Sequence, residues 1–538
     1  MASHTSRILA LLLAAAGSSL ATGYTSSSLT PRGPVSFPLS LESVQRHSGS
    51  LEKRNADIFL YNISAAAYLV TLSIGTPGQR VRVTVDTGSD ELWVNPVCNF
   101  TSYYVDDADV KQCQSSGRYD PTLSNTSIDL HRTDKIRYGK GSVHFQYYND
   151  TVTQPDSDIS VKNFHFGVAT RSTDLYEGIL GLGFAQNKGY PTFASAIAEQ
   201  GAAGGTTNVF SVALASSNEA NAGVLVLGGV DTERFAGRMM PVPILPPPEA
   251  DTLVRYWVKL DSIGLSDSGS TSSLQSNDSS KVYPGSGGPV VLDTGTTLSI
   301  LPSSVIAALA NDLGGGVLTP LDTRSSTSTP TAHFYKVPCA AIGRDSDVHS
   351  KDNQAGLKRT VDFSFNNGSA FIRVPLYEFS SEVTSSQGGP KTCVLGALAV
   401  DTDSSSSSGP SVDGLNPDLG LTMLLGASFL RGAYVAFDQS ANSVYMAPYA
   451  RCLGNNSNLQ PLASEAPGMA GTIDGSCEVK DTLYAGGAGG YAAVASSNGT
   501  GTGSGSGNKK NAGSPVNSSS TASVMLAVLS VALALLLA

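Results

Sequence analysis

The stretch VTVDTGS at residues 83–89 recurs in altered form as VVLDTGT at residues 290–296. In the first stretch valines alternate with other residues, which indicates a half-buried strand, and in the second a continuous apolar run indicates a strand buried on both faces. Each stretch is followed later by two apolar residues and a glycine, ILG at residues 179–181 and LLG at residues 424–426. The same order of parts, found twice, predicts an internal duplication and two homologous β lobes.

The aspartates of the two stretches, Asp86 and Asp293, are the main candidates for chemistry. If each lobe brings one carboxyl group to a shared interface, about 3 Å from the other, both cannot ionise easily and they share one proton. One carboxylate can then take a proton from a water while the other polarises a carbonyl, with no covalent intermediate, metal or cofactor. The alternative is two aspartates that only cap turns, which the duplication disfavours. We therefore expect a catalytic pair that titrates as a unit.

The three residues after each aspartate fit this role. A glycine in the second of these positions lets the backbone turn tightly, because no Cβ is in the way. The threonine before it can hydrogen-bond across the interface, and the hydroxyl residue after it can donate to the outer carboxylate oxygen. The supporting residues predicted in this way are Thr87, Gly88, Ser89, Thr294, Gly295 and Thr296.

The rest of the body reads as short strands joined by Gly-rich turns, so the chain is predicted to be mainly β. Helical patterns are few. One covers residues 192–200, and a second covers residues 303–313, with Ser303 as the expected N-cap and Gly314 after its end.

Composition narrows the class of protein without naming a function. Of the 538 residues, 14% are charged, against about 25% in an ordinary soluble domain, while 41% are hydrophobic and can build a core. The net charge is −10 and there is no dense basic cluster, which argues against nucleic acid as a partner. The composition excludes collagen, a coiled coil, a polytopic membrane protein and wholesale disorder.

The N-terminal end predicts secretion. In residues 1–21, Arg7 precedes a short apolar run, and SLA at residues 19–21 has the form of a signal-peptide cleavage site; a buried core helix is the alternative. Residues 22–54 show little periodic pattern and end in Lys53-Arg54, which predicts a propeptide with a dibasic processing site. Two solvated charges are the alternative interpretation of that pair.

The C-terminal end predicts a lipid anchor. Residues 524–538 are apolar and uncharged, but they are too few to cross a hydrocarbon core of about 30 Å. Small residues and a polar spacer precede them, so residues 511–538 resemble a glycolipid (GPI) attachment signal, for which a short single-span anchor is the alternative. Asn511 is the predicted attachment residue, with Gly513, Ser514 and Asn517 as alternatives. Residues 451–510 are predicted to form a Cys-containing tail and a Gly- and Ser-rich stalk.

Acceptor motifs for N-glycosylation recur along the chain, and in a chain with a signal peptide they suggest a glycosylated surface. The predicted acceptors are Asn62, Asn99, Asn125, Asn149, Asn277, Asn367, Asn455 and Asn498.

Over about residues 66–450 these motifs resemble the pepsin family (A1) of aspartic endopeptidases, and most of all its fungal, GPI-anchored yapsin-like branch. The resemblance implies an all-β, bilobal acid-protease fold within a catalytic domain of residues 55–450. Its N-lobe would cover about residues 66–245 and its C-lobe about residues 246–450, with the active-site cleft between them.

The resemblance also implies a substrate-binding flap. The stretch IRYGKGS at residues 136–142 is similar to the family's flap hairpin, with Tyr138 as the flap tyrosine and Gly139 and Lys140 beside it. Trp93 is similar to the tryptophan that hydrogen-bonds this tyrosine. In the second lobe, LLGASFLR at residues 424–431 has Ala427 where the family usually has Asp, a departure outside the catalytic pair.

Six cysteines allow 15 disulfide connectivities, so the sequence alone does not decide among them. The resemblance implies Cys98–Cys113 and Cys339–Cys393, which leaves Cys452 with Cys477.

Cleavage preference stays open at this point. Asp106, Asp107 and Asp109 form an acidic loop that would attract basic peptides, although a merely solvated loop is an equal alternative. Lys140, next to the flap tyrosine, would instead oppose a basic residue at the cleavage site.

The sequence as a whole predicts a monomeric, extracellular aspartic endopeptidase tethered at the plasma membrane or cell wall. It would be made as a zymogen, act on proteins or peptides, and favour acidic pH because the carboxyl pair needs one proton. The alternatives are a catalytically inactive binding protein of the same fold and a structural wall glycoprotein. Asp86, Asp293, Tyr138 and Trp93 are all present, which favours the enzyme.

Overall fold

The computed structural model describes the folded body in eighteen stretches of the chain. They are residues 34–42, 67–98, 107–138, 141–155, 159–173, 175–185, 188–200, 209–215, 223–249, 251, 253–266, 281–318, 332–344, 359–383, 392–400, 423–450, 457–462 and 473–477. All lie in a compact unit of residues 1–494. Within these stretches, no helix has both the length and the apolar character needed to span a membrane.

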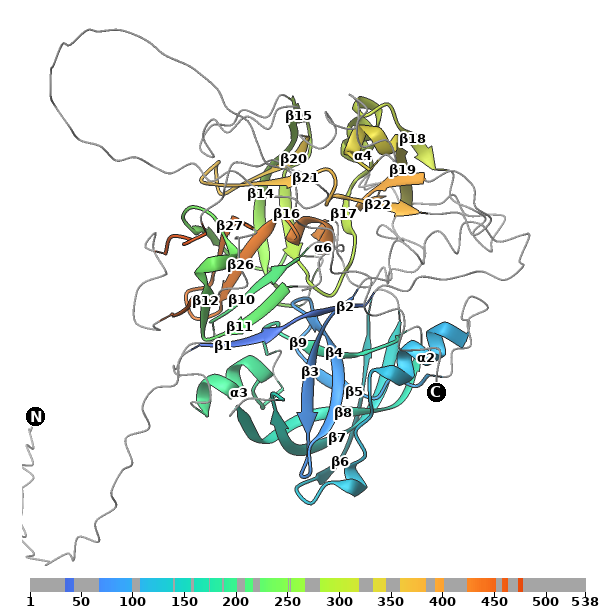
Figure 1. Cartoon of the computed structure of the whole chain (residues 1–538), viewed down its shortest axis with the longest axis vertical. Helices are drawn as coiled ribbons and strands as arrows, with labels where there is room; N and C mark the ends of the chain where they lie inside the picture. The colour runs from blue at the N-terminus through green and yellow to red at the C-terminus, as the bar shows by residue number, and fades with distance from the viewer. Residues whose placement is uncertain are drawn as a thin grey trace, which may run out of the picture. The chain divides into compact units, whose positions relative to one another are not determined.

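The N-terminal lobe is built on an eight-stranded sheet, drawn in blue to cyan in Figure 1. In spatial order its strands are β2 (Ser40–Glu42), β3 (Ala67–Ile74), β4 (Gln79–Asp86), β9 (Gly178–Gly181), β5 (Leu92–Val94), β8 (Ser160–Thr173), β7 (Ser142–Thr153) and β6 (Ile128–Arg137). The valines of β4 alternate as predicted, and all three lie in the core.

The C-terminal lobe is built on a twelve-stranded sheet, drawn largely in yellow and orange. Its main path is β21 (Ala370–Pro375), β20 (Thr360–Phe365), β14 (Trp257–Ser266), β16 (Gly288–Leu292), β25 (Leu424–Leu425), β17 (Ser299–Pro302), β24 (Ala397–Val400), β19 (Ala332–Val337), β23 (Thr392–Leu395) and β22 (Ser380–Val383). Two strands lie off this path, β15 (Lys281–Tyr283) beside β14 and β18 (Gly316–Leu318) beside β19.

A third sheet contains strands from both sides of residue 245, the expected boundary between the lobes. Its six strands are β1 (Val35–Pro38), β11 (Gly223–Leu227), β10 (Val209–Leu214), β26 (Ala433–Asp438), β27 (Ser443–Pro448) and β13 (Met240–Pro243). The pairing of β10 with β26 brings the end of the expected C-lobe onto the expected N-lobe. The aromatic rings of Phe210 and Phe437 stack across this pair with centroids 4.9 Å apart.

The internal duplication is visible in the strand pairing. In the N-lobe, β4 runs parallel to β9, so that Asp86 lies opposite Gly181. In the C-lobe, β16 runs parallel to β25 in the same way, with Leu292 opposite Leu425. Each Asp-Thr-Gly loop therefore leaves a strand whose neighbour is the later apolar-apolar-Gly stretch. The prediction of a mainly β, bilobal fold is confirmed.

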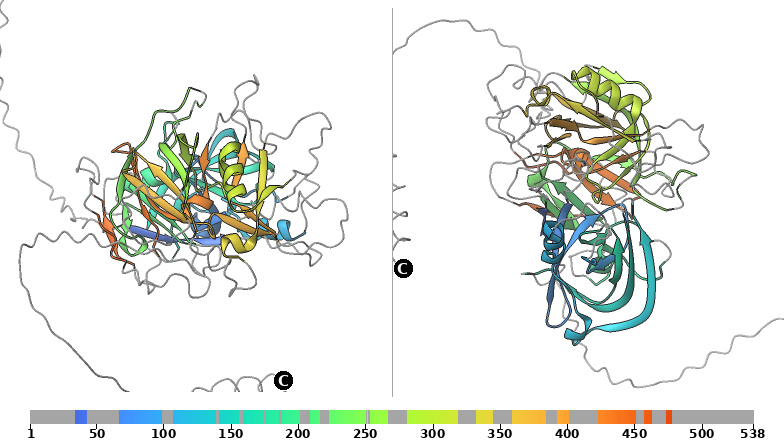
Figure 2. Two further views of the ribbon diagram at one scale, coloured as in Figure 1. Left: turned by 90° about the horizontal axis from the view of Figure 1, so that it is seen from above. Right: turned by 90° about the vertical axis from the view of Figure 1, so that its right-hand side faces the viewer.

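The two predicted helices are present, with one error of detail. They are α3 (Phe193–Glu199), which lies against β8, and α4 (Ser303–Asp312), which lies against β19 and β24; both views of Figure 2 keep α4 with the C-lobe strands. Ser303 was wrongly predicted as the N-cap of α4: Pro302 holds that position and makes no side-chain capping bond. The helix therefore starts directly where β17 ends.

Two further helices were not predicted. The segment before the flap, expected to be an acidic loop, contains α2 (Asp107–Ser115), and α6 (Ala427–Leu430) follows β25. Asp106 lies outside the described residues. The short 3₁₀ turns are η1 (Pro121–Leu123), η2 (Thr232–Arg234) and η3 (Cys339–Ile342).

Segments on both sides of the expected catalytic domain of residues 55–450 pair with strands inside it. Within the expected propeptide, β1 pairs with β11 and β2 pairs with β3, and Phe37 and Leu39 are buried in the core. Within the expected tail, β28 (Leu459–Pro461) pairs with β12 (Gly229–Asp231), and Cys477 is buried. Both short segments gain hydrogen bonds and apolar contacts from distant strands, which a local pattern does not reveal.

Candidate active site

The two Asp-Thr-Gly loops meet where the lobes join. Asp86 ends β4 and Asp293 follows β16, and the two side chains are almost fully buried. A Cβ on Gly295 would lie 2.5 Å from Asp86 Oδ1, and a Cβ on Gly88 would lie 2.9 Å from Asp293 Oδ2. Only glycine leaves room here, because real Cβ atoms do not approach other atoms this closely. Each loop therefore presses its glycine against the carboxyl group of the other loop.

Two threonines lock the loops together across the lobes. The Thr87 hydroxyl donates to the Leu292 carbonyl at 2.9 Å, and the Thr294 hydroxyl donates to the Val85 carbonyl at 2.8 Å. Each hydroxyl oxygen also accepts from the backbone N–H of the other threonine, at 3.1 Å and 3.0 Å. All four bonds are buried, so they hold the two loops in one register with little competition from water.

Each carboxyl group accepts two hydrogen bonds from its own loop. At Asp86, the Gly88 N–H donates at 2.8 Å and the Ser89 hydroxyl donates at 2.5 Å. At Asp293, the Gly295 N–H donates at 2.8 Å and the Thr296 hydroxyl donates at 2.7 Å. The two carboxyl groups thus have matching donors, as the internal duplication would produce.

The pair of carboxyl groups favours retention of a proton. Burial, and then the negative charge of Asp293, raise the pKa of Asp86 well above the usual value for an aspartate. The donors Ser89 and Gly88 act in the opposite direction, because they stabilise the ionised form. The balance leaves a carboxyl group that holds its proton at pH values where an exposed aspartate has lost it.

Tyr138, the expected flap tyrosine, lies near Asp86 of the first loop. Tyr138 follows β6, and the hairpin β6–β7 carries it. The Trp93 indole N–H donates to the Tyr138 hydroxyl at 2.9 Å. Burial, and then the charge of Asp86, raise the pKa of Tyr138 well above its ordinary value. Gly139 and Lys140 lie outside the described residues.

A buried carboxylate beside the first loop was not found by sequence reasoning. Glu91 accepts from Lys188 Nζ at 2.6 Å, from the Tyr190 hydroxyl at 2.8 Å and from the Tyr147 hydroxyl at 3.3 Å. Burial raises the pKa of Glu91, although the charge of Lys188 acts in the opposite direction. Because Tyr147 belongs to β7, this network ties the flap hairpin to the segment that follows Asp86.

Residues of the other lobe also reach the first loop, and no local motif marks them. The Arg255 guanidinium donates to the Gly88 carbonyl at 2.5 Å. The hydroxyl of its neighbour Tyr256 donates to the Leu182 carbonyl at 2.7 Å, in the turn after β9. In the sequence, these two residues are distinguished only by their position directly before the segment that forms strand β14.

The disulfides implied by the family resemblance are present as far as the described residues extend. Cys98 is bonded to Cys113, with an S–S distance of 2.05 Å, and Cys339 is bonded to Cys393, with an S–S distance of 2.00 Å. Cys477 is also disulfide-bonded. Its expected partner Cys452 lies outside the described residues.

Three of the predicted glycosylation acceptors can be placed. Asn125 and Asn367 are exposed, whereas Asn149 is half-buried and donates to Asn163 Oδ1 at 3.2 Å. The predicted acceptors and attachment residues outside the described stretches are Asn62, Asn99, Asn277, Asn455, Asn498, Asn511, Gly513, Ser514 and Asn517.

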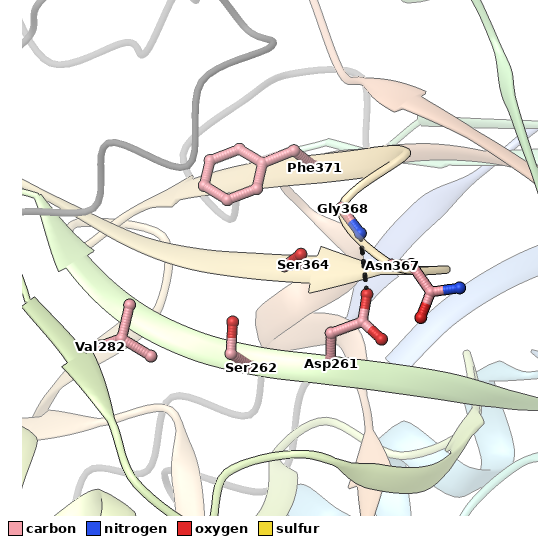
Figure 3. A pocket seen from close by; sticks show the side chains of 7 residues that line it. All are labelled: Asp261, Ser262, Val282, Ser364, Asn367, Gly368 and Phe371. Atoms are coloured by element: carbon pink, nitrogen blue, oxygen red, sulfur yellow. Dashed lines mark hydrogen bonds between the residues drawn. The ribbon is translucent and has the colours of Figure 1, made fainter.

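A surface pocket of about 300 Å³ lies on the C-lobe sheet and is separate from the carboxyl pair. Figure 3 shows Phe371 and Ser364 on one side of it and Asp261 on the other, where the Gly368 N–H donates to Asp261 at 3.0 Å. No described lining residue shares a hydrogen bond with either Asp-Thr-Gly loop. No group of side chains suited to binding a metal occurs within the described stretches.

The site just described is that of an aspartic peptidase, and comparison with known proteins gives the family. A sequence model of the eukaryotic aspartyl protease family matches residues 67–449, and the chain belongs to this family. The predicted pepsin-family membership and aspartic-type endopeptidase activity are thereby confirmed. The narrower resemblance to the yapsin-like branch stays a prediction.

Curated relatives are similar over most of the chain. The probable aspartic-type endopeptidase opsB of Aspergillus oryzae is 27% identical over 392 residues, 71% of this chain and 68% of the relative. Secreted aspartic protease 4 of Candida albicans is 28% identical over 389 residues, 71% of this chain and 76% of the relative. The acid protease of Saccharomycopsis fibuligera is 29% identical over 71% of this chain and 80% of the relative.

Among solved structures, the aspartic proteinase from Irpex lacteus aligns over 78% of this chain and 98% of its own, with 18% identity and a TM-score of 0.49.

Proposed function

We propose that Asp86 and Asp293 hydrolyse peptide bonds of proteins by activating one water molecule between them. The observation that carries this proposal is the pair of facing, buried carboxyl groups, each with two donors from its own loop. Such a pair shares one proton, because two adjacent buried carboxylates repel each other and are poorly solvated.

The reaction follows from that shared proton. The ionised carboxylate takes a proton from the water as the water oxygen bonds to the scissile carbonyl carbon. The protonated carboxyl group donates its proton to the carbonyl oxygen, which yields a neutral tetrahedral diol. The carboxyl group that took the proton of the water then gives it to the amide nitrogen, while the other carboxylate takes a proton from one hydroxyl of the diol. The C–N bond breaks to give a carboxylic acid and an amine, and one proton remains on the pair. Tyr138, fixed by its hydrogen bond from Trp93, would lie beside the bound substrate.

The expected pH dependence has two limbs. Activity requires one proton on the pair, so it falls at high pH as that proton is lost, and it falls at low pH as both groups become protonated. The raised pKa of Asp86 keeps the active form present across acidic pH.

The enzyme would be secreted, made as a zymogen and held at the cell surface by a GPI anchor. The supports for this are the predicted signal peptide of residues 1–21, the dibasic pair Lys53-Arg54 and the attachment signal of residues 511–538. Relatives named as secreted aspartic proteases agree with the extracellular site. If the chain is cut after Arg54, strands β1 and β2 are no longer covalently joined to the rest, and they would be retained by their pairing with β11 and β3 and by the burial of Phe37 and Leu39.

One experiment tests the chemistry. The processed protein is incubated with a denatured protein substrate from pH 3 to 7, with and without pepstatin, beside the variant Asp86→Asn. We expect pepstatin-sensitive cleavage that is greatest at acidic pH and is abolished in the variant. Cleavage that survives Asp86→Asn, or no cleavage by the wild type at any pH, would refute the proposal. Release of the protein from membranes by a phosphatidylinositol-specific phospholipase tests the anchor separately.

A further inference from the structure

We propose that Arg255 is a positioning residue for the peptidase reaction, because it holds the first Asp-Thr-Gly loop in place from the other lobe. This inference rests on the proposed function of the Asp86–Asp293 pair. Arg255 lies just before β14 of the C-terminal lobe, yet its guanidinium donates to the Gly88 carbonyl of the N-terminal lobe at 2.5 Å.

The guanidinium is fixed on its other side by a buried carboxylate. Arg255 Nε donates to Asp251 Oδ2 at 2.9 Å, and the two side chains are 8% and 3% exposed. Asp251 is itself held, because it accepts from the Trp257 indole N–H at 3.0 Å and from the Leu253 backbone N–H at 3.0 Å. Arginine suits this position, since its planar fork can serve a carboxylate and a carbonyl at once.

The carbonyl that Arg255 binds lies between the two donors to Asp86. The Gly88 N–H precedes this carbonyl and donates to Asp86 Oδ1, and the Ser89 hydroxyl follows it and donates to Asp86 Oδ2. Rotation of the peptide between Gly88 and Ser89 would therefore move Ser89 relative to the carboxyl group. The arginine resists that rotation with a charge-assisted hydrogen bond, which is stronger than one between neutral groups.

The second loop has no equivalent contact in the described part of the chain. Both loops also accept a backbone hydrogen bond at the carbonyl of their fourth residue: the Gly183 N–H donates to the Ser89 carbonyl at 2.7 Å, and the Ala427 N–H donates to the Thr296 carbonyl at 2.8 Å. The arginine is an addition to the first loop alone. The hydrogen bond from Arg255 therefore makes the two Asp-Thr-Gly loops unequal, and it is found at the loop near Tyr138.

A second contact from the same segment supports this role. The Tyr256 hydroxyl donates to the Leu182 carbonyl, and Gln439 Nε2 donates to the Tyr256 hydroxyl at 2.7 Å and to the Gly183 carbonyl at 3.1 Å. Arg255 and Tyr256 thus hold the two neighbouring loops of the N-lobe site, one each.

Loss of the guanidinium has a defined consequence for the chemistry. With the peptide free to rotate, the hydrogen bonds to Asp86 weaken and the ionised form of the pair is less stabilised. The pH–activity profile of kcat/KM should then move toward higher pH, by about one unit. Because the reacting groups are misplaced while the substrate cleft is kept, we expect kcat to fall by about 10- to 100-fold and KM to change little.

The test compares Arg255→Met with Arg373→Met in the processed enzyme. Arg373 also faces a buried carboxylate, Asp362, at 3.7 Å, with exposures of 13% and 0%, and among the described residues it makes no hydrogen bond to either Asp-Thr-Gly loop. Both variants lose a buried ion pair, so both should lower the melting temperature. Only Arg255→Met should lower kcat and shift the pH profile. Wild-type kcat and pH profile in Arg255→Met, or equal changes in the control, would overturn the proposal.

Arg255→Lys covers the case in which Arg255→Met does not fold. Lysine keeps the charge beside Asp251 but lacks the fork, so kcat should fall by about 10-fold with a smaller shift in the pH profile. A folded Arg255→Lys with unchanged kcat and profile would also overturn the proposal. Failure of the proposed function is distinguishable, since then the wild type would be inactive or Asp86→Asn would remain active.

Discussion

The two Asp-Thr-Gly loops make the same internal bonds but have different surroundings. Each gives its carboxyl group one backbone and one hydroxyl donor, and each presses a glycine on the other. The loop of Asp86 lies near Tyr138 and is held by Arg255, whereas the described residues place neither kind of contact on the loop of Asp293. The duplication thus makes the carboxyl groups alike, and contacts from distant segments make their loops unequal.

The largest expected effect is the loss of kcat when either carboxylate is removed. Asp86→Asn and Asp293→Asn should each lower kcat by about 10⁴-fold or more, because the shared proton and the paired acid and base are lost together. Single-turnover cleavage of a denatured protein measures this loss, with circular dichroism as the folding control. If one of the two variants kept substantial activity, the carboxyl groups would not act as an equivalent pair.

Removal of either threonine hydroxyl that joins the two loops should lower the stability by the same amount. Thr87→Val and Thr294→Val each remove one buried donor and one buried acceptor, and each should lower the free energy of unfolding by about 1–3 kcal/mol. Chemical denaturation measures both values under the same conditions. Clearly unequal losses would show that the symmetry of the hydrogen bonds does not extend to their energies.

The hydrogen bond between Trp93 and Tyr138 should affect catalysis through the loop of Asp86 only. Trp93→Phe removes the 2.9 Å hydrogen bond to Tyr138 while keeping an aromatic ring, and should lower kcat/KM by about 10-fold. Because Trp93 is fully buried, the smaller ring also leaves a cavity, and the melting temperature should fall as well. Steady-state kinetics on a peptide substrate, beside a melting curve, checks this. A fall in melting temperature without a fall in kcat/KM would assign Trp93 to the core alone.

The last expected effect is a pH dependence of stability. Because the pKa of Asp86 is raised in the folded protein, the folded state binds this proton more tightly than the unfolded state. The stabilisation is complete below the unfolded value of about 4 and is lost as pH rises toward the folded value. Asp86→Asn should therefore gain stability relative to the wild type between pH 4 and pH 7. A difference in melting temperature that stays constant over this range would contradict the raised pKa.

Much of the site could be predicted because its parts are local in sequence. Asp86, Gly88 and Ser89 lie within four consecutive positions, and the same parts recur at Asp293. Strand alternation and tight-turn chemistry are properties of neighbouring residues, so a short pattern carries them. Trp93 and Tyr138 were found through the family resemblance, since nothing local joins two residues that are 45 positions apart.

Other features could not be predicted, because they depend on contacts between residues that are far apart in the sequence. Strands β1 and β2 lie in the predicted propeptide, where we found no periodic pattern, and they form by pairing with β11 and β3 elsewhere in the chain. Nothing in the sequence singled out Glu91, because its partner Lys188 is 97 positions away. Ser303 was expected to cap α4, but the end of β17 at Pro302 sets where that helix begins.

By itself, the sequence determined the duplication, the mainly β architecture and the identity of the two carboxyl groups, because repeated motifs and strand patterns are written in adjacent residues. Only the tertiary structure decided that the lobes share a six-stranded sheet and that Arg255 donates a hydrogen bond to the Gly88 carbonyl, 167 positions earlier in the chain. Such contacts depend on how complete sheets pack and on which buried polar groups then need partners. Those needs arise only once the chain has folded.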